Sequence, residues 1–508
     1  MVRLGIDLGT TRTVVAVADR GNYPIVSFTS PDGDVLDHYP TVTAEVDGLL
    51  VHGLRAVAAA RAGAPSLGSW KRLFAELGSR QRVAIGSTEL TLGDLATSFL
   101  KALRKDLLEA SNLPAHAGGP LEAVVSVPAN AHSRQRFLTL DAFRRAGFAV
   151  RGMLNEPSAA GLEYAHRHDR TISSLREHVA IYDLGGGTFD AALVLIAGGR
   201  HDVVATSGVA RLGGDDFDSA LLELALSVGG ITRTLTPTER ATALEECRFA
   251  KEALNPNSRR LVLDLAALEP KGGGVTVPIA DYYERVRPLV EASMESLDPV
   301  LRADTDDARG EGVTDAELAG IYVVGGASGL PLVPRVLRER FGRRVHRSPY
   351  PSAATAIGLA IAAEEDAAVE VHEQFTRHLG VFRERDGGSD VSFDRIFEKG
   401  TPMPVGGAEP LTVVRAYRAA HDLGHFRFVE CGAVDQKGGP CGDITPHAEV
   451  RFPFAPGLRG KADLSGRAAR RLATPGPRIE ERYEVDEAGV IAVTITDLDA
   501  GYTERHVL

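Results

Sequence analysis

A short glycine-rich segment occurs near the start of the chain and again in its middle, and this near-repeat constrains the fold more than any other feature. The first copy, residues 5–11, reads Gly-Ile-Asp-Leu-Gly-Thr-Thr, and the second, residues 181–188, reads Ile-Tyr-Asp-Leu-Gly-Gly-Gly-Thr. In each copy an apolar strand ends at an Asp, followed by a glycine turn and hydroxyl side chains. Glycines let backbone N–H groups approach phosphate oxygens, and an Asp can hold hydrated Mg²⁺. The duplication predicts two related lobes with a phosphate chain held between them.

A third segment, residues 321–331, extends this pattern. It reads Ile-Tyr-Val-Val-Gly-Gly-Ala-Ser-Gly-Leu-Pro, which predicts a buried strand, a turn at Gly325 and Gly326, and a helix that Pro331 opens. Such a turn admits the flat face of a nucleoside. Together the three segments resemble the actin-like ATPase superfamily, whose two-lobed α/β, ribonuclease H-like fold binds ATP between its lobes.

Further motifs narrow this resemblance to one family. They occur in the order expected of the heat-shock protein 70 (DnaK-like) chaperones and cover about the first 365 residues. The chain is therefore identified as a divergent member of that family. The motifs are Lys71-Arg72-Leu73, Val127-Pro128-Ala129 with Gln135-Arg136, Asn155 to Ala160, and Leu212 to Asp218.

The resemblance implies an ATPase that slowly converts ATP and water to ADP and phosphate. Lys71 and Glu156 would orient the attacking water and stabilise charge at the γ-phosphate, and the implied catalytic set also includes Asp183 and Thr188. Asp7 and Asp183 would hold the hydration shell of Mg²⁺, with a monovalent cation such as K⁺ as a further candidate.

The resemblance also implies a set of nucleotide contacts. For one member, Asp190, a simple turn-capping role is the alternative. The implied contacts are Gly9, Thr10, Thr11, Gly185, Gly186, Gly187, Asp190, Gly213, Gly214, Lys251, Asn255, Gly325 and Gly326.

Several residues at the expected nucleoside site depart from the family pattern. Arg248 stands where the family usually has an acid, Glu252 follows Lys251, and Gly329 replaces a stacking Arg. Ser352 likewise replaces an acid. These differences predict weaker base contacts and poorer adenine selectivity.

The implied partners are an unfolded peptide or a dedicated protein client, and a nucleotide-exchange factor is a further candidate. Gly152 occupies a place where bacterial relatives keep an Arg that engages J-domain partners, which leaves a J-domain partner open. The expected linker has only Val369 and Val371 in place of a leucine run, so it is predicted to dock more weakly on the ATPase.

The chain is expected to contain an actin-like nucleotide-binding domain over residues 1–365, a linker over 366–374 and a smaller β-sandwich domain over 375–508. In the first part, apolar spacing predicts a strand over 121–127 and helices over 92–110, 133–147, 237–254 and 353–364. In the second, alternation predicts strands over 411–417, 425–429, 448–454, 480–485 and 490–496.

Other stretches of the C-terminal part lack that alternation. Residues 432–446 are rich in Gly and Pro, residues 459–478 are basic, and both stretches read as extended loops. Because the sequence stops soon after the β part, the helical lid of the family is expected to be absent.

Composition excludes several other functions. A net charge of −11 over 508 residues argues against nonspecific nucleic-acid binding. No run approaches the roughly 20 apolar residues of a membrane span, and no leader peptide precedes the first strand, so no membrane partner and a cytoplasmic location are expected. The zinc-ligand types His421, His425, Cys431, Cys441 and His447 lie close in sequence, but their spacing matches no compact Cys-x-x-Cys knuckle.

Two other functions occur on the same superfold. Actin-like relatives form filaments that use hydrolysis to time disassembly, but they need neither the motif around Glu156 nor an appended β domain. Small-molecule kinases need a further catalytic Asp near a pocket between the lobes, and no segment resembles one. The chaperone-like reading is therefore preferred.

Overall fold

The structure is a computed structural model that describes residues 2–76, 81–113, 120–266, 268, 274–302, 313, 317–364, 369–385, 388–405, 407–460 and 463–508. It contains two compact units. The first consists of residues 1–129 and 138–371, and the second of residues 130–137 and 372–508. The start of the expected linker, residues 366–368, lies outside the described residues.

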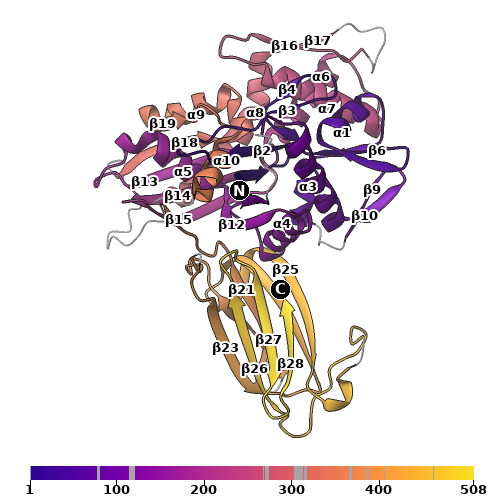
Figure 1. Cartoon of the computed structure of the whole chain (residues 1–508), viewed down its shortest axis with the longest axis vertical. Helices are drawn as coiled ribbons and strands as arrows, with labels where there is room; N and C mark the ends of the chain where they lie inside the picture. Colours follow the sequence, from indigo (N-terminus) through magenta and orange to yellow (C-terminus); the bar gives the residue numbers. More distant parts are fainter. Residues whose placement is uncertain are drawn as a thin grey trace. The chain divides into compact units, whose positions relative to one another are not determined.

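The first unit contains two large sheets built on the same plan (Figure 1). Their strand orders are β12-β11-β1-β2-β5 and β19-β18-β13-β14-β15-β20. In the first sheet β1 and β2 form an antiparallel hairpin, and β11 and β12 continue the sheet beside β1 as parallel strands. In the second sheet β13 and β14 form the equivalent hairpin, and β18 and β19 continue it beside β13 in the same way. The duplicated loops therefore lie at the turns of equivalent hairpins, as the near-repeat predicts.

The strands of these sheets are largely buried, and β11 is buried at every position. Its bounds are those that its run of apolar residues predicts. The bounds in the first sheet are β1 Val2–Leu8, β2 Arg12–Val17, β5 Tyr39–Pro40, β11 Leu121–Val127 and β12 Ala149–Asn155. Those in the second are β13 His178–Leu184, β14 Phe189–Ala197, β15 Arg200–Val209, β18 Leu318–Val324, β19 Val345–Arg347 and β20 Glu370–His372.

The four helices predicted from apolar spacing are confirmed, with ends that differ by one or two residues. Helix α3 begins where the Thr91 hydroxyl accepts a hydrogen bond from the Asp94 N–H, and α7 begins with a capping box between Thr236 and Glu239. The helices are α1 Gly53–Arg61, α2 Leu73–Glu76, α3 Leu92–Glu109, α4 Ser133–Arg145, α5 Glu156–His168, α6 Gly214–Val228, α7 Pro237–Glu252, α8 Ile279–Leu301, α9 Leu332–Phe341 and α10 Ala354–Ala363.

Helices α5 and α10 pack against each other without intervening side chains. A Cβ on Gly358 would lie 1.7 Å from the carbonyl oxygen of Ala159, so only glycine fits at this crossing. Helix α5 contacts strands of both sheets, and α10 contacts strands of the first sheet. Small residues at this position therefore set the spacing of the two lobes.

The lobes also contain smaller sheets. The linker contributes strand β20 to the second large sheet. In β20 the N–H of Glu370 donates to the carbonyl of Gly199, and the half-buried Val369 and Val371 pack on a cluster that includes Ile357. The small-sheet strands are β3 Phe28–Thr29, β4 Val35–Leu36, β6 Val42–Val46, β7 Leu49–His52, β8 Ser66–Gly68, β9 Arg82–Ile85, β10 Thr88–Thr91, β16 Arg260–Leu263 and β17 Val275–Pro278.

The second unit is a β-sandwich of two four-stranded sheets, ordered β22-β21-β24-β25 and β23-β26-β27-β28. Its core gathers phenylalanines such as Phe428 and Phe452 with Tyr483. The strands are β21 His378–Arg385, β22 Asp390–Phe397, β23 Leu411–Arg418, β24 Leu423–Val434, β25 Pro440–Pro453, β26 Arg478–Val485, β27 Ile491–Asp497 and β28 Tyr502–Val507.

The expectation of a loop over 432–446 is wrong for most of that stretch. Strands β24 and β25 continue through it as one long hairpin, and only residues 435–439 form the turn. Asp435 closes this turn by accepting the N–H groups of Lys437 and Gly439. Backbone pairing between β24 and β25 therefore determines the structure of this stretch, despite its Gly and Pro residues. The described residues of 459–477 form neither helix nor strand, as expected.

The cysteines and histidines of the second unit are dispersed over its strands. Cys431 and Cys441 are free thiols on the paired strands β24 and β25, not in loops. His421 lies 3.3 Å from Glu384, and His425 lies 2.7 Å from Glu449. Across the described part of the chain, no three or more His, Cys, Asp or Glu side chains group closely enough to hold a metal ion directly.

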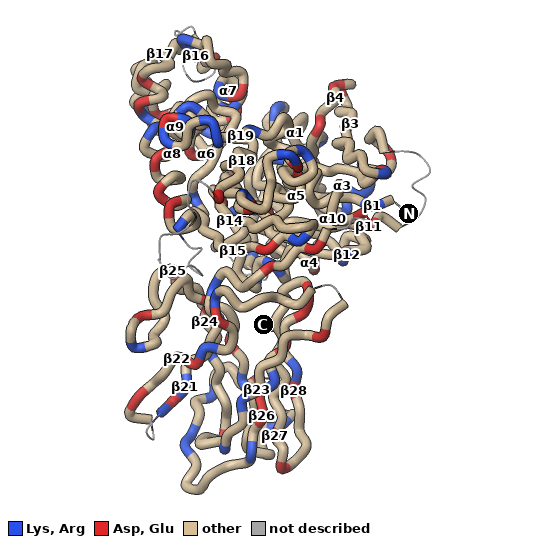
Figure 2. Tube along the Cα trace, turned by 90° about the vertical axis from the view of Figure 1, so that its left-hand side faces the viewer, with Lys and Arg blue, Asp and Glu red and all other residues tan. Residues whose placement is uncertain are grey.

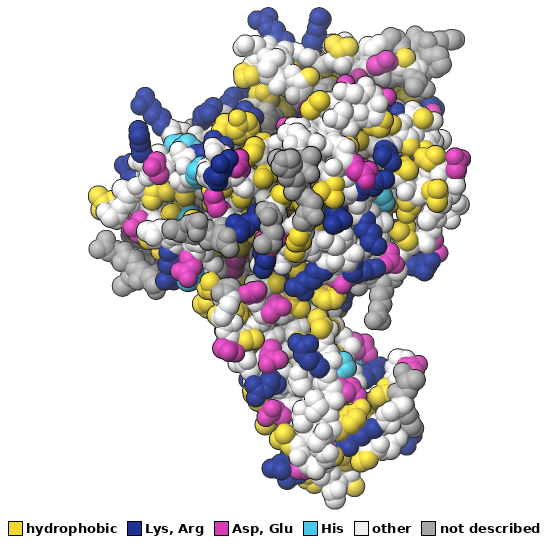
Figure 3. All heavy atoms as spheres, viewed as in Figure 1, with side chains coloured by type: hydrophobic (Ala, Val, Ile, Leu, Met, Phe, Trp, Pro, Cys, Tyr) yellow, Lys and Arg dark blue, Asp and Glu magenta, His cyan; other side chains and the backbone are white. Residues whose placement is uncertain are grey.

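The surface carries both charge signs, interspersed on the face drawn in Figure 3. Helix α9 is a basic element, with Arg335, Arg338 and Arg340 (Figure 2). None of the helices in the described ranges is both long and apolar enough to cross a membrane.

Candidate nucleotide-binding site

A cleft of about 1090 Å³ lies in the first unit and is lined by residues of both lobes. It gathers most of the residues that the sequence singled out, although they come from segments far apart in the chain. Those that line it are Asp7, Gly9, Thr10, Thr11, Lys71, Glu156, Asp183, Gly185, Gly186, Thr188, Gly214, Lys251, Asn255, Gly325 and Gly326.

The first glycine loop connects β1 to β2 and is braced from the side by Thr41. The Thr41 hydroxyl donates to the carbonyl of Gly9 at 2.9 Å, and its N–H donates to the carbonyl of Thr11. Within the loop, the N–H of Gly9 donates to the carbonyl of Asp7. These bonds fix the loop while Thr10 and Thr11 line the cleft.

The second glycine loop connects β13 to β14 and is braced by the start of α6. The N–H groups of Gly214 and Asp215 donate to the carbonyls of Gly185 and Gly186. Gly213 therefore lies behind this loop and does not line the cleft, and neither does Gly187. The prediction that both contact the nucleotide remains a prediction, and the structure gives Gly213 a supporting position.

The turn after β18 approaches the second loop closely. Gly325 has φ of +84°, and a Cβ there would lie 2.4 Å from a carboxylate oxygen of Asp183. Only glycine combines this backbone conformation with that contact. The turn thereby brings Gly326 and Gly329 to the cleft wall.

Three carboxylates, those of Asp7, Glu156 and Asp183, meet the ammonium of Lys71 at the base of the cleft. Lys71 Nζ lies 2.8 Å from Glu156 Oε1, and both side chains are buried. The Ser126 hydroxyl donates to Asp7 at 2.8 Å. Although burial opposes the charge of Lys71, Glu156 and Asp7 raise the pKa of its ammonium.

The carboxylates near Lys71 resist ionisation. Burial, reinforced by the charge of Glu156, raises the pKa of Asp7 to about 6. Burial, together with Glu156, Asp190 and Asp7, raises the pKa of Asp183 well above its ordinary value. The cluster therefore lacks positive charge, which is a condition that a bound cation would relieve.

Asp190 lies beside this cluster but does not line the cleft. It is buried and accepts the N–H of Ala129 at 3.1 Å, and it is bonded by the side chain of Thr188. Burial and the charge of Glu156 raise the pKa of Asp190 to about 7. Its position fits both the turn-capping alternative and support of the charged cluster.

Lys251 is held by a network that the sequence did not predict. Its ammonium donates to the carbonyl of Gly214 at 2.9 Å and lies 2.6 Å from Asp218. Arg248, the residue that replaces an acid of the family, is bonded to Asp215 at 2.9 Å. The Asp215–Asp218 segment was recognised as a motif, but only the packing of α6 on α7 gives its partners.

One further ion pair spans the cleft. Arg12, which follows the first glycine loop, pairs with Glu252 at the end of α7. Both line the cleft. Arg72 adds a second link between the lobes, 3.6 Å from Asp215. Glu252 is thus engaged with the first lobe, and no local sequence signal connects residues this far apart.

The comparison with known proteins identifies the family. Residues 85–374, more than half of the chain, match the family model described as Hsp70 protein. The proteins named "Chaperone protein DnaK" from two strains of Halobacterium salinarum are each 28% identical over 512 residues, which cover 99% of this chain and 74% of each relative. The chain belongs to the Hsp70 family.

By this distant relationship, the chain is a chaperone-like ATPase of that family. The actin-like lobes and their cleft agree with it.

Proposed function

We propose that the chain binds ATP with Mg²⁺ in the cleft, hydrolyses it slowly to ADP and phosphate, and uses its β domain to bind a peptide or a dedicated protein partner. The observation that carries the ATPase part is the buried Lys71–Glu156 pair, which lines the same cleft as both glycine loops. Phosphoryl transfer needs mainly positioning and charge neutralisation, and these residues supply both.

The two loops would hold the phosphate chain from opposite lobes. A Cβ on Gly186 would lie 2.6 Å from the Thr11 hydroxyl, so the loops approach each other closely. The backbone N–H of Gly186 and the hydroxyls of Thr10 and Thr11 would be the donors for phosphate oxygens, while the N–H of Gly185 closes its own loop by donating to the carbonyl of Thr188. Bracing by Thr41 and by α6 keeps these donors in place before the nucleotide arrives.

The charged cluster fits a hydrated Mg²⁺. Asp7 and Asp183 come from the equivalent strands β1 and β13, and burial together with the neighbouring carboxylates raises the pKa of each. These two carboxylates would hold the hydrated ion, and Mg²⁺ would supply positive charge to neutralise the phosphates. A monovalent cation such as K⁺ is a second candidate for the same cluster.

Lys71 and Glu156 would act on the water that attacks the γ-phosphate. Glu156 accepts a hydrogen bond from Lys71, which holds its carboxylate in one orientation. A second oxygen of Glu156 is available to orient water, and the ammonium would stabilise charge that develops on the transferred group. Asp190, behind the cluster, would keep Thr188 oriented.

The proposed partner is an extended polypeptide, with a nucleotide-exchange factor as a further candidate. Support comes from the family relationship and from the fold of the second unit, whose two sheets form an independent core.

Phosphate release by the full chain tests this function. We expect slow release from ATP with Mg²⁺, loss of release in EDTA, and a change in rate when denatured polypeptide is added. Light scattering of the same samples separates the filament alternative, because nucleotide-dependent growth would favour polymerisation. No phosphate release under any condition would refute the proposal.

A further inference from the structure

Arg347 at the end of β19 is a cationic side chain of the cleft without a protein partner. It lines the cleft, is exposed, and forms no side-chain hydrogen bond or ion pair with any residue in the described ranges. Three other cleft arginines are engaged: Arg12 pairs with Glu252, Arg248 pairs with Asp215, and Arg335 lies 5.4 Å from the ring centre of Tyr283. Arg338 on α9 also lines the cleft without an ion pair or side-chain hydrogen bond to any described residue, and of these two arginines it is Arg347 that lies next to Gly329. A free guanidinium facing a cleft is available to a ligand.

The local fold places Arg347 over Gly329. Strand β19 pairs in parallel with β18, with Arg347 opposite Val323, just before the turn that leads to Gly329. A terminal nitrogen of Arg347 lies 3.6 Å from the position that a Cβ on Gly329 would occupy. An Ala at 329 would make only an ordinary contact, whereas a long side chain would compete with the guanidinium for space.

This position belongs to the nucleoside end of the cleft. Gly325, at the start of the turn, lies against Asp183 and the charged cluster, whereas Gly329 ends the short helix that follows. Leu330 and Pro331 continue the same wall. A planar guanidinium beside an apolar wall is suited to stacking on the face of a base.

We propose that Arg347 stacks on the base of the bound nucleotide and supplies the guanidinium that Gly329 lacks. The inference rests on the proposed function, because it requires a nucleotide in the cleft. It differs from the expectation from sequence, in which Gly329 means weaker base contacts. Stacking on a π face tolerates every base, so Arg347 raises affinity for nucleotides in general and not for adenine alone.

The test compares ATP with inorganic tripolyphosphate, which carries phosphates but no base. Binding of each, with Mg²⁺, is measured by titration calorimetry on the full-length parent, Arg347→Ala and Arg347→Lys. We expect Arg347→Ala to weaken ATP binding about tenfold and to leave tripolyphosphate binding unchanged. Arg347→Lys keeps the positive charge but lacks the planar guanidinium, so it should weaken ATP binding nearly as much as Arg347→Ala does.

A control variant tests whether any exposed arginine of this region contributes. Arg343→Ala removes a nearby exposed arginine that does not line the cleft, and it should be neutral.

The outcomes separate the two proposals. Equal weakening of ATP and tripolyphosphate in Arg347→Ala would make Arg347 a phosphate contact and overturn the inference. Unchanged ATP binding in that variant would overturn it as well, with the proposed function intact. A parent that binds neither ligand would refute the proposed function itself.

Discussion

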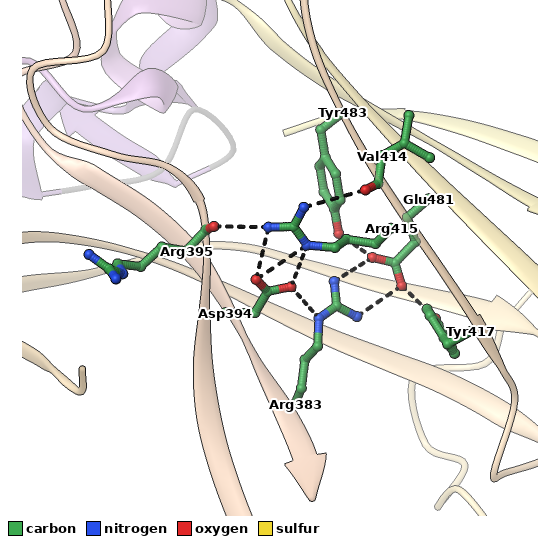
Figure 4. A network of polar contacts seen from close by, with 8 residues as sticks. All are labelled: Arg383, Asp394, Arg395, Val414, Arg415, Tyr417, Glu481 and Tyr483. Carbon is green, nitrogen blue, oxygen red and sulfur yellow. Dashed lines mark hydrogen bonds and ion pairs between the residues drawn. The ribbon is translucent and has the colours of Figure 1, made fainter. Parts of the chain in front are cut away.

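Each of the two units contains a cluster of buried and half-buried charges, and the clusters differ in their balance. In the β-sandwich, Arg383 and Arg415 meet Asp394 and Glu481 between the two sheets (Figure 4). Arg383 bonds both oxygens of Glu481, at 3.1 and 2.7 Å, and Asp394 at 2.6 Å. Two cations thus face two anions.

The cleft of the first unit is unbalanced. Asp7, Glu156, Asp183 and Asp190 surround the single ammonium of Lys71. The pKa directions follow: burial and like charges raise the pKa of Asp183, whereas in the sandwich Arg415 and Arg383 overcome burial and lower the pKa of Asp394.

The charge balance of a cluster indicates whether the cluster stabilises the fold or forms a ligand site. A balanced cluster satisfies its own charges and ties strands together, whereas an unbalanced one leaves an excess of negative charge that a bound cation would offset. The comparison predicts that removing a negative charge raises the unfolding free energy of the ligand-free first unit and lowers that of the sandwich.

The largest effect is expected from Glu481→Ala. Glu481 is fully buried, and its loss leaves the Arg383 guanidinium without its main partner between the sheets. Removing one partner of a buried pair costs about 3–5 kcal/mol of unfolding free energy. Hydrogen exchange of β21 and β26, followed by mass spectrometry in urea, measures it.

Two variants control this prediction. Glu480→Ala removes the neighbouring acid, which lies on the other face of β26 and is half-buried, and should cost little. Arg383→Met with Glu481→Met removes both charges together and should restore much of the loss. If Glu481→Ala unfolds like the parent, the network is not structural.

Lys71→Ala should have the next largest effect, which is measured on the rate of hydrolysis. It removes the ammonium that the described carboxylates of the cluster share, so hydrolysis should fall about a hundredfold or more while ATP binding largely survives. Because the variant also leaves buried Glu156 without its partner, the unfolding free energy should fall as well. Single-turnover phosphate release measures the rate. Lys101→Ala, on the exposed face of α3, is the matched control. Parental hydrolysis by Lys71→Ala would remove Lys71 from the mechanism.

The sequence predicted the cleft well because its signals are local. Each glycine loop carries its Asp, glycines and threonines within a few positions, and their duplication fixes how the lobes pair. Lys71 and Glu156 came from motifs of equally short range. The structure brings these residues, apart from Gly187, to the lining of one cleft.

What the sequence did not predict depends on distant partners. Arg383 and Glu481 sit on strands of different sheets, and nothing in either local pattern marks the other. Arg347 was missed for the same reason, because only the pairing of β19 with β18 places it over Gly329.

A third prediction uses pH on the ligand-free first unit. The pKa of Asp183 and that of Asp190 are both raised, so the protonated forms favour the folded state. The contribution of Asp190 is complete near pH 4 and is lost as pH rises through its pKa of about 7. Unfolding free energy should therefore fall between pH 6.5 and 8.5, by on the order of 1 kcal/mol. This window lies above the range in which the buried His52 and His201, whose pKa values are lowered, oppose the trend.

Trp70, the single tryptophan, is buried beside Lys71 and reports this unit alone. Urea midpoints from its fluorescence, in EDTA, give the pH dependence. Asp190→Asn should flatten the dependence, and ATP with Mg²⁺ should reduce it. A midpoint that rises with pH would contradict the unbalanced cluster.

The smallest expected effect comes from making the same Asp→Asn substitution in each cluster, which compares the two clusters directly. Asp183→Asn removes one of four crowded negative charges, so the ligand-free first unit should gain up to about 1 kcal/mol by Trp70 fluorescence even though Mg²⁺-dependent ATP binding weakens. Asp394→Asn takes an anion from between Arg383 and Arg415, and the sandwich should lose about 1–2 kcal/mol by hydrogen exchange of β22 and β23. Opposite signs would establish that charge balance separates the two clusters. Destabilisation by both variants would mean that the cleft carboxylates hold the fold together, and their raised pKa values could then no longer be taken as the mark of a ligand site.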